Sequence, residues 1–154
     1  MHKYPNLGAD SLFKINSPKD VRYNCIAYAS NKTDAFWWPE KKDGVDWPFG
    51  LPYDNSVENF IRLFEKQQYT VCIDDTFEDG FQKIAIYGKD DNTGTHAAKQ
   101  LFDGRWASKM GLLEDIVHTS PTSIEGPSYG HVKVIMKRPN SSFKLATAKH
   151  VKLG

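Results

Sequence analysis

Residues 95–108 read Thr-His-Ala-Ala-Lys-Gln-Leu-Phe-Asp-Gly-Arg-Trp-Ala-Ser, and this stretch decides the fold that we predict. Asp103-Gly104 is a strong tight-turn signal between two strand-like segments, 95–101 and 105–108. Three further segments have the composition or alternation of β-strands: 69–73, 83–87 and 131–136. The second half of the chain therefore predicts an antiparallel sheet.

Helical signals precede this sheet. Residues 55–67 carry apolar side chains at helical spacing, with Asp54-Asn55-Ser56 as a start signal. An earlier helix has two alternative starts: Ser17, which is followed by a proline, or Asn24, which would cap a helix beginning at Cys25. Residues 112–118 are suited to another short helix.

Helices followed by an antiparallel meander predict an α+β fold. We expect one domain over residues 1–154, with an irregular lead-in over 1–20 and a long loop over 31–53, where proline and glycine exclude regular structure.

The composition excludes several classes of function. Twenty Lys and Arg face 19 Asp and Glu, so we expect no nucleic-acid partner and no membrane surface. Cys25 and Cys72 are too few for a disulfide framework, and no Cys-x-x-Cys pair predicts a metal. No apolar run resembles a signal peptide, which favours a cytoplasmic protein or one exported without a cleaved signal.

Cys25 and His96 are the candidate nucleophile and base. A helix capped by Asn24 would place Cys25 in its first turn, where free N–H groups and the helix dipole lower a thiol pKa and stabilise an oxyanion. His96 lies near a strand start beside two alanines, which leave room for another element. Ser108 would hydrogen-bond the far nitrogen of the imidazole.

A structural interpretation stays open beside the catalytic one. If the helix starts at Ser17, Cys25 falls in its middle and is a buried core residue, as free cysteines often are. His96 would then be a structural hydrogen-bonding residue. Cys72 is assigned to the core in either case.

Other residues are candidates for supporting or binding roles. Asp115 and His118 are three apart on the predicted helix, so they would share a face. There they would orient the site, supply the true base or form a surface ion pair. Lys109 would bind an anionic group or remain solvated. Cys25, His96 and His118 are suitable zinc ligands, but no short-spaced pair anchors such a site, and we predict neither a metal nor a cofactor.

Aromatic residues gather in the loop over 31–53. Trp37, Trp38, Trp47 and Phe49 would either form a stacking wall for a peptide or a sugar, or make a private core for the loop.

Five motifs resemble an uncharacterised bacterial domain family, a domain of unknown function. They are Asn24-Cys25-Ile26-Ala27, Trp37-Trp38-Pro39, His96-Ala97-Ala98, Trp106-Ala107-Ser108-Lys109-Met110-Gly111 and Asp115-Ile116-Val117-His118. The resemblance spans about residues 20–138.

The chain distantly resembles cell-wall cysteine peptidases of the papain-like superfamily. Asn24-Cys25 stands where those enzymes have Asp-Cys, His96 matches their base, and Ser108 stands where they often have a second His. Ile26-Ala27 replaces their Ser-Gly. The resemblance implies a papain-like fold, with N-terminal helices packed on an antiparallel sheet.

The implied function is hydrolysis or acyl transfer at an amide through Cys25, His96 and Ser108. The amide would belong to a peptide, peptidoglycan or a glutamine side chain, and Asn24, Trp37, Trp38 and Lys109 would bind the substrate. The alternative is a non-enzymatic binding module that uses the tryptophan-rich loop, or a toxin or immunity component with a protein partner.

Overall fold

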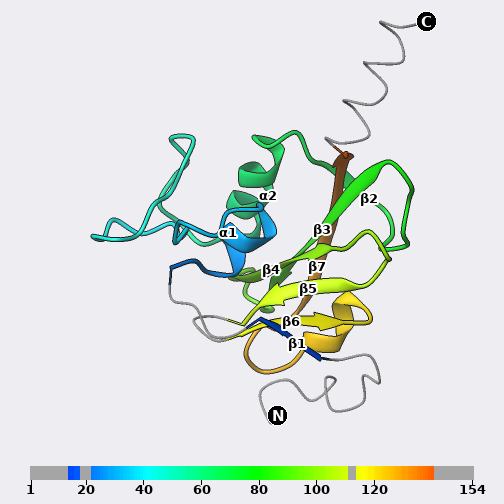
Figure 1. Cartoon of the computed structure of the whole chain (residues 1–154). Helices are drawn as coiled ribbons and strands as arrows, with labels where there is room; N and C mark the ends of the chain where they lie inside the picture. The colour runs from blue at the N-terminus through cyan, green and yellow to red at the C-terminus, as the bar shows by residue number, and fades with distance from the viewer. Residues whose placement is uncertain (1–13, 18–21, 111–113, 141–154) are drawn as a thin grey trace, which may run out of the picture.

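A seven-stranded antiparallel sheet forms the centre of the molecule (Figure 1). The computed structural model describes residues 14–17, 22–110 and 114–140. The strand order is β1-β6-β5-β4-β3-β7-β2. The strands are β1 Lys14–Ser17, β2 Thr70–Cys72, β3 Phe81–Gly88, β4 Gly94–Gln100, β5 Trp106–Lys109, β6 Asp115–His118 and β7 His131–Pro139.

The two faces of the sheet carry different elements. On the first, which we call the helix face, α1 (Cys25–Ala29) and α2 (Val57–Glu65) pack against the strands. The strand residues of this face include Ile84, Ile86, Ala97, Ala107 and Met136. The second, the η2 face, is named for the 3₁₀ helix Pro121–Ile124 and includes Ala85, Tyr87, Ala98, Trp106 and Ile116.

The predicted papain-like α+β fold with N-terminal helices is wrong. Helix α1 has only five residues, and α2, with nine, is the one longer α-helix in the described part of the chain. Residues 115–118, expected to be helical, form β6, which hydrogen-bonds β5 on one side and β1 on the other. Strand pairing on both sides outweighs the weak local preference of such a short segment.

The prediction that residues 1–20 are irregular is wrong for residues 14–17, the part of that segment that the structure describes. Residues 14–17 pair with β6 as strand β1 instead of being irregular, while residues 1–13 and 18–20 of the predicted lead-in lie outside the described residues. Helix α1 begins at Cys25 with Asn24 as its N-cap, which was the second of the two predicted starts.

Several expectations are confirmed. Helix α2 begins after Ser56, whose side chain accepts a hydrogen bond from the Asn59 N–H. The tight turn between β4 and β5 is present, and Gly104 adopts φ +89°, a value that a residue with a Cβ rarely adopts. The loop over 31–53 packs through Trp38 and Trp47, whose rings meet Phe60 of α2 edge-on at 5.5 and 5.9 Å.

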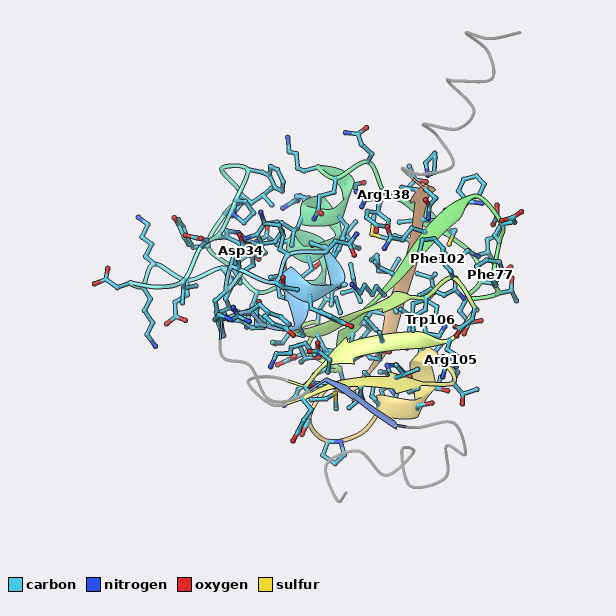
Figure 2. The ribbon with its side chains drawn as sticks, in the orientation of Figure 1. Asp34, Phe77, Phe102, Arg105, Trp106 and Arg138 are labelled. Atoms are coloured by element: carbon cyan, nitrogen blue, oxygen red, sulfur yellow. The ribbon has the colours of Figure 1, made fainter. Side chains whose placement is uncertain are left out.

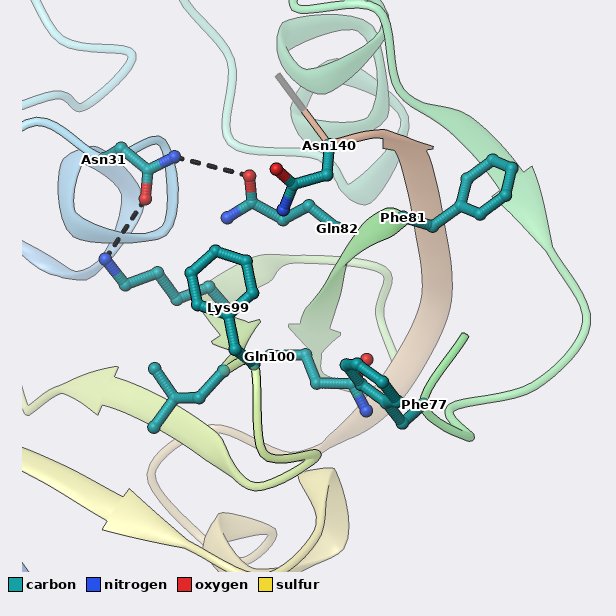
Figure 3. Close-up of a pocket in the computed structure, with 9 residues that line it drawn as sticks. Asn31, Phe77, Phe81, Gln82, Lys99, Gln100 and Asn140 are labelled. Atoms are coloured by element: carbon teal, nitrogen blue, oxygen red, sulfur yellow. Dashed lines mark hydrogen bonds between the residues drawn. The ribbon is translucent and has the colours of Figure 1, made fainter. Parts of the chain in front are cut away.

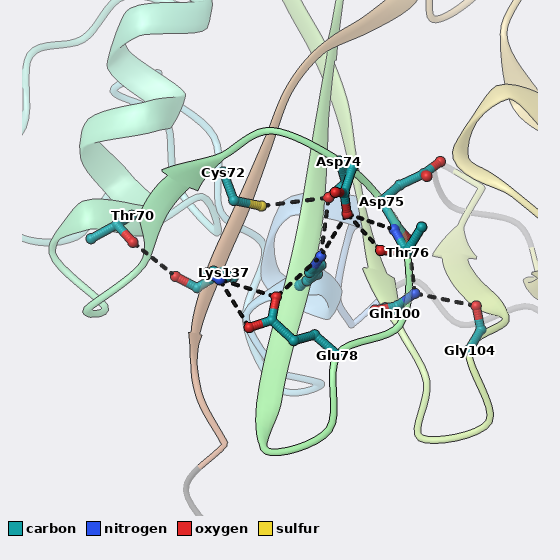
Figure 4. Close-up of polar contacts among 10 residues, drawn as sticks. Thr70, Cys72, Asp74, Asp75, Thr76, Glu78, Gln100, Gly104 and Lys137 are labelled. Carbon is teal, nitrogen blue, oxygen red and sulfur yellow. Dashed lines mark hydrogen bonds and ion pairs between the residues drawn. The ribbon is translucent and has the colours of Figure 1, made fainter.

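The connection between β2 and β3 is tied to the sheet by charged groups (Figure 4). Glu78 accepts hydrogen bonds from the Lys137 ammonium at 3.0 Å. The ammonium of Lys83, a residue only 1% exposed, lies 3.2 Å from Asp74 and 3.7 Å from Glu78. A buried ammonium needs such partners, since it would otherwise be desolvated without compensation.

We expect Phe60→Ala to destabilise the protein by about 3–5 kcal/mol, because Phe60 is fully buried and supports both tryptophans. Phe102→Ala is the matched control, since Phe102 is 79% exposed, and surface changes of this kind fall within about 0.5 kcal/mol. Urea unfolding measures both. Equal losses would contradict the packing described.

Candidate functional site

The Asn24 side chain joins α1 to the tryptophan-rich loop. Its Oδ1 accepts hydrogen bonds from the Ala27 N–H at 3.3 Å and the Trp37 N–H at 3.0 Å, and its Nδ2 donates to the Trp37 carbonyl at 2.7 Å. Asn24 was predicted to bind substrate. In this conformation its amide instead caps the helix and holds the backbone of Trp37, a residue only 8% exposed.

The Cys25 thiol lies in the first turn of α1 and is 6% exposed. Burial raises its pKa to about 11, although hydrogen bonds from the backbone at Ala97, Ile26 and Cys25 itself and the charge of Lys109 oppose the shift. Only N–H donors can favour a thiolate in this way, but the predicted lowering of the thiol pKa does not occur. Burial outweighs them, and the thiol is neutral at pH 7.

His96 lies on the η2 face, away from Cys25. Its ring stacks on Tyr129 with 4.0 Å between centroids and meets Tyr87 edge-on at 5.2 Å. The next residue of β4, Ala97, belongs to the helix face, because successive strand residues point to opposite faces. The structure therefore does not bring the predicted base to the predicted nucleophile.

The His96 imidazole is also unpaired. It is fully buried, and within the described part of the chain neither ring nitrogen has a hydrogen-bond partner. Burial, and secondarily the charge of His118, hold its pKa well below 6.5. The ring is therefore neutral and wedged between two tyrosines.

Ser108 pairs with His118 instead of His96. The Ser108 hydroxyl lies 2.9 Å from His118 Nε2, and His118 Nδ1 lies 2.8 Å from the Ser120 carbonyl oxygen. A carbonyl only accepts, so His118 Nδ1 carries a proton and donates a hydrogen bond to Ser120. Both side chains are fully buried on the η2 face.

Asp115 and Lys109 belong to the helix face. Because residues 115–118 form a strand, Asp115 and His118 point to opposite faces instead of sharing one. Asp115 accepts a hydrogen bond from the Tyr23 hydroxyl at 2.6 Å, and the Lys109 ammonium lies 5.1 Å from the centre of the same ring. Lys109 is fully buried, beyond direct reach of a ligand in solution.

Two adjoining hollows open beside Cys25, and together we call them the aromatic groove. The first, of ≈ 360 Å³, is lined by residues that include Cys25 and Phe36, and the second, of ≈ 430 Å³, reaches Gly94. Trp38, Thr95 and Tyr129 line both hollows. Of the predicted binding residues, Asn24 and Trp38 line the groove.

The family model for a domain of unknown function, DUF7689, matches residues 14–137, from the start of β1 into β7. The chain belongs to the DUF7689 family. This confirms the expectation of an uncharacterised domain family. No curated protein and no solved structure gives a significant match.

Within the described residues, no helix is long and apolar enough to cross a membrane. In the same part of the chain, no group of three or more His, Cys, Asp or Glu side chains is placed to hold a metal ion.

Sequence reasoning missed Thr95 and Tyr129, which this DUF7689 chain places between the two hollows. The Thr95 hydroxyl donates to the Tyr129 carbonyl at 2.6 Å and fixes the 125–130 turn against β4. The turn itself carried a signal, because Gly126 and Gly130 flank Tyr129 and both adopt positive φ.

We expect Cys25 to resist alkylation at pH 7 in a Cys72→Ser protein. A pKa of about 11 instead of 9.0 lowers the thiolate population about 100-fold relative to a free cysteine, and burial slows the reaction further. Iodoacetamide labelling against pH, read by mass spectrometry, gives the rate. The Cys25→Ser protein is the comparison, in which the more accessible Cys72 should react faster. Rapid labelling of Cys25 at neutral pH would contradict this.

We expect His96→Phe to reduce the loss of stability in acid. In the unfolded chain the His96 imidazole binds a proton near pH 6.5, whereas in the folded protein the buried ring does not. Protonation therefore favours the unfolded state, and the free energy of unfolding decreases as the pH falls below 6.5. Between pH 8 and 5 the variant should lose about 2 kcal/mol less than the parent.

His131→Phe is the matched control, because that imidazole is exposed. Urea midpoints at the two pH values measure the effect. A His96→Phe protein with the parent's pH dependence would show that His96 is not held neutral.

Proposed function

We propose that this protein is a binding module that holds an extended, peptide-like chain in the aromatic groove. The observation that carries the proposal is the shared wall of the two hollows, in which Trp38, Thr95 and Tyr129 belong to both. A ligand that fills one hollow can therefore continue into the next, as an extended chain does.

The chemistry of the walls supports a peptide. Phe36, Trp38 and Val45 offer an apolar seat for one side chain beside Cys25. Around the second hollow the walls are more polar and include Asn55, Thr93 and Ser128. Such alternation of an apolar seat and polar groups suits an amide chain with apolar side chains.

The charges at the groove are balanced. Glu40 and Lys42 line the first hollow, and Lys89 and Asp91 line the second, so each contains one acid and one base. A polyanion such as nucleic acid is bound by clustered cations, and the described residues of this groove form no such cluster. The balance favours an uncharged chain.

The groove favours binding over catalysis in the observed conformation. A nucleophilic thiol requires its thiolate and a base in reach. Cys25 has a pKa of about 11, and His96 lies on the other face of the sheet. Cys25 then serves as a small apolar part of the groove floor.

We expect the peptide Ac-Gly-Leu-Gly-Gly-NH₂ to bind with a Kd of about 1 mM, typical of so small a ligand. The peptide Ac-Gly-Asp-Gly-Gly-NH₂, in which aspartate replaces leucine, should bind more weakly. Titration into ¹⁵N-labelled protein should shift the Trp38 indole and Tyr129 amide signals. Trp38→Ala should weaken binding about tenfold or more, since that residue lines both hollows.

Phe49→Ala is the matched control. Phe49 is an exposed aromatic residue of the same loop, and it lines neither hollow. Its substitution should leave the Kd unchanged. Absence of shifts with every peptide, or shifts that survive in Trp38→Ala, would overturn the proposal.

Acyl transfer at Cys25 is a second candidate function, favoured by the backbone hydrogen bonds around the sulfur. The thiolate would attack an amide carbonyl and the amine would leave with a proton from an imidazole. This reaction needs a conformation in which His96 reaches the helix face. Alkylation of Cys25 at neutral pH that is lost in His96→Ala would favour acyl transfer. A Cys25 thiol that does not react at neutral pH would favour the binding function.

A further inference from the structure

A separate cavity lies at the far end of β4, away from the aromatic groove (Figure 3). It measures ≈ 260 Å³, and its walls include Asn31 after α1, Gln82 of β3 and Lys99 of β4. We call it the Lys99 cavity. We propose that it binds a carboxylate attached to a hydrophobic body.

Lys99 supplies the positive charge. Its ammonium donates to Asn31 Oδ1 at 3.1 Å and lies 4.1 Å from the centre of the Tyr28 ring. Among the described residues no carboxylate lies within 4.0 Å of it. Burial lowers the pKa of this amine, and the charge of Asp115 opposes the effect. A bound anion would supply a counter-charge in direct contact with the ammonium.

A second donor, the side-chain amide of Gln82, lines the same cavity. The Gln82 Oε1 accepts from Asn31 Nδ2 at 3.5 Å and from Arg138 Nη2 at 3.4 Å. This orientation leaves Gln82 Nε2 with no hydrogen bond to the described residues. Figure 3 shows Asn31 hydrogen-bonded to both the Gln82 amide and the Lys99 ammonium. A carboxylate has two oxygens and can accept from both donors.

Exposed aromatic side chains flank the same cavity. Phe77 is 46% exposed and Phe102 is 79% exposed, and both line it. Figure 2 places them at one end of the molecule. The loop that carries Phe77 packs on the turn after β4, because a side chain added at Gly104 would meet Phe77 Cβ at 3.5 Å. Large exposed apolar groups beside a cation favour a ligand with an apolar body and one negative charge.

Among the described residues, the walls of the cavity hold one cation and no acid. A phosphate or polyanion is normally held by more cations or by several backbone N–H groups. A neutral apolar ligand would leave the ammonium uncompensated. A hydrophobic carboxylate satisfies both constraints, whether it is a free acid or the C-terminus of a peptide.

The test titrates N-acetylphenylalanine and N-acetylphenylalaninamide, which differ in the carboxylate, into the ¹⁵N-labelled full chain. The acid should shift the side-chain amides of Asn31 and Gln82 and bind about tenfold or more tightly than the amide. Lys99→Gln should remove that preference, while Lys66→Gln, at an exposed lysine after α2, should keep it.

Two further variants keep the test decisive. Phe102→Ala, at a position too exposed to affect folding, should lower the affinity for N-acetylphenylalanine severalfold. This result can be obtained even if Lys99→Gln does not fold. Trp38→Ala should leave acid binding unchanged, which separates this site from the aromatic groove. Equal binding of acid and amide, or no binding of the acid, would overturn the proposal.

A third ligand, 3-phenylpropionate, distinguishes the two sources of the carboxylate. It carries the phenyl group and carboxylate without the amide of a peptide. Binding as tight as that of N-acetylphenylalanine would assign the cavity to free hydrophobic acids. Weaker binding would assign it to peptide C-termini, whose last amide then contributes to recognition.

Discussion

The structure around the aromatic groove depends on one side-chain amide. Asn24 makes three hydrogen bonds, one to the first turn of α1 and two to the backbone of Trp37. These bonds join a helix of only five residues, which could not persist alone, to a loop with little regular structure. Cys25 and Trp38 each follow one of the joined residues directly, so the groove floor and wall are placed together.

The sequence predicted the helix start at this junction but not the position of His96 relative to it. Asn24 carries a local signal, since asparagine is a favoured N-cap, and the position of Cys25 followed from it. The position of His96 did not follow, because it depends on which face each residue of β4 occupies. His96, Ala97 and Ala98 are all fully buried, so the strand shows no polar–apolar alternation. A register shift near Tyr87 further obscures the face of each residue.

Strand β6 failed prediction for a related reason. Asp115–His118 is buried throughout, with Ile116 and Val117 on opposite faces of the sheet. A short apolar run of this kind has no periodicity that separates a strand from a buried helix, and its identity is decided by partners β1 and β5. Helix α2, in contrast, has one buried face and one exposed face, and its spacing alone identified it.

Strand β4 has a consequence for the molecule as a whole. It begins at the aromatic groove, with Gly94 and Thr95, and its Lys99 lines the second cavity, while α1 likewise leads from Cys25 towards Asn31. Helix α1 is only five residues long, so a displacement of it that one ligand favoured would reach both places. Thermodynamic linkage would then require that each ligand change the other's affinity by the same factor.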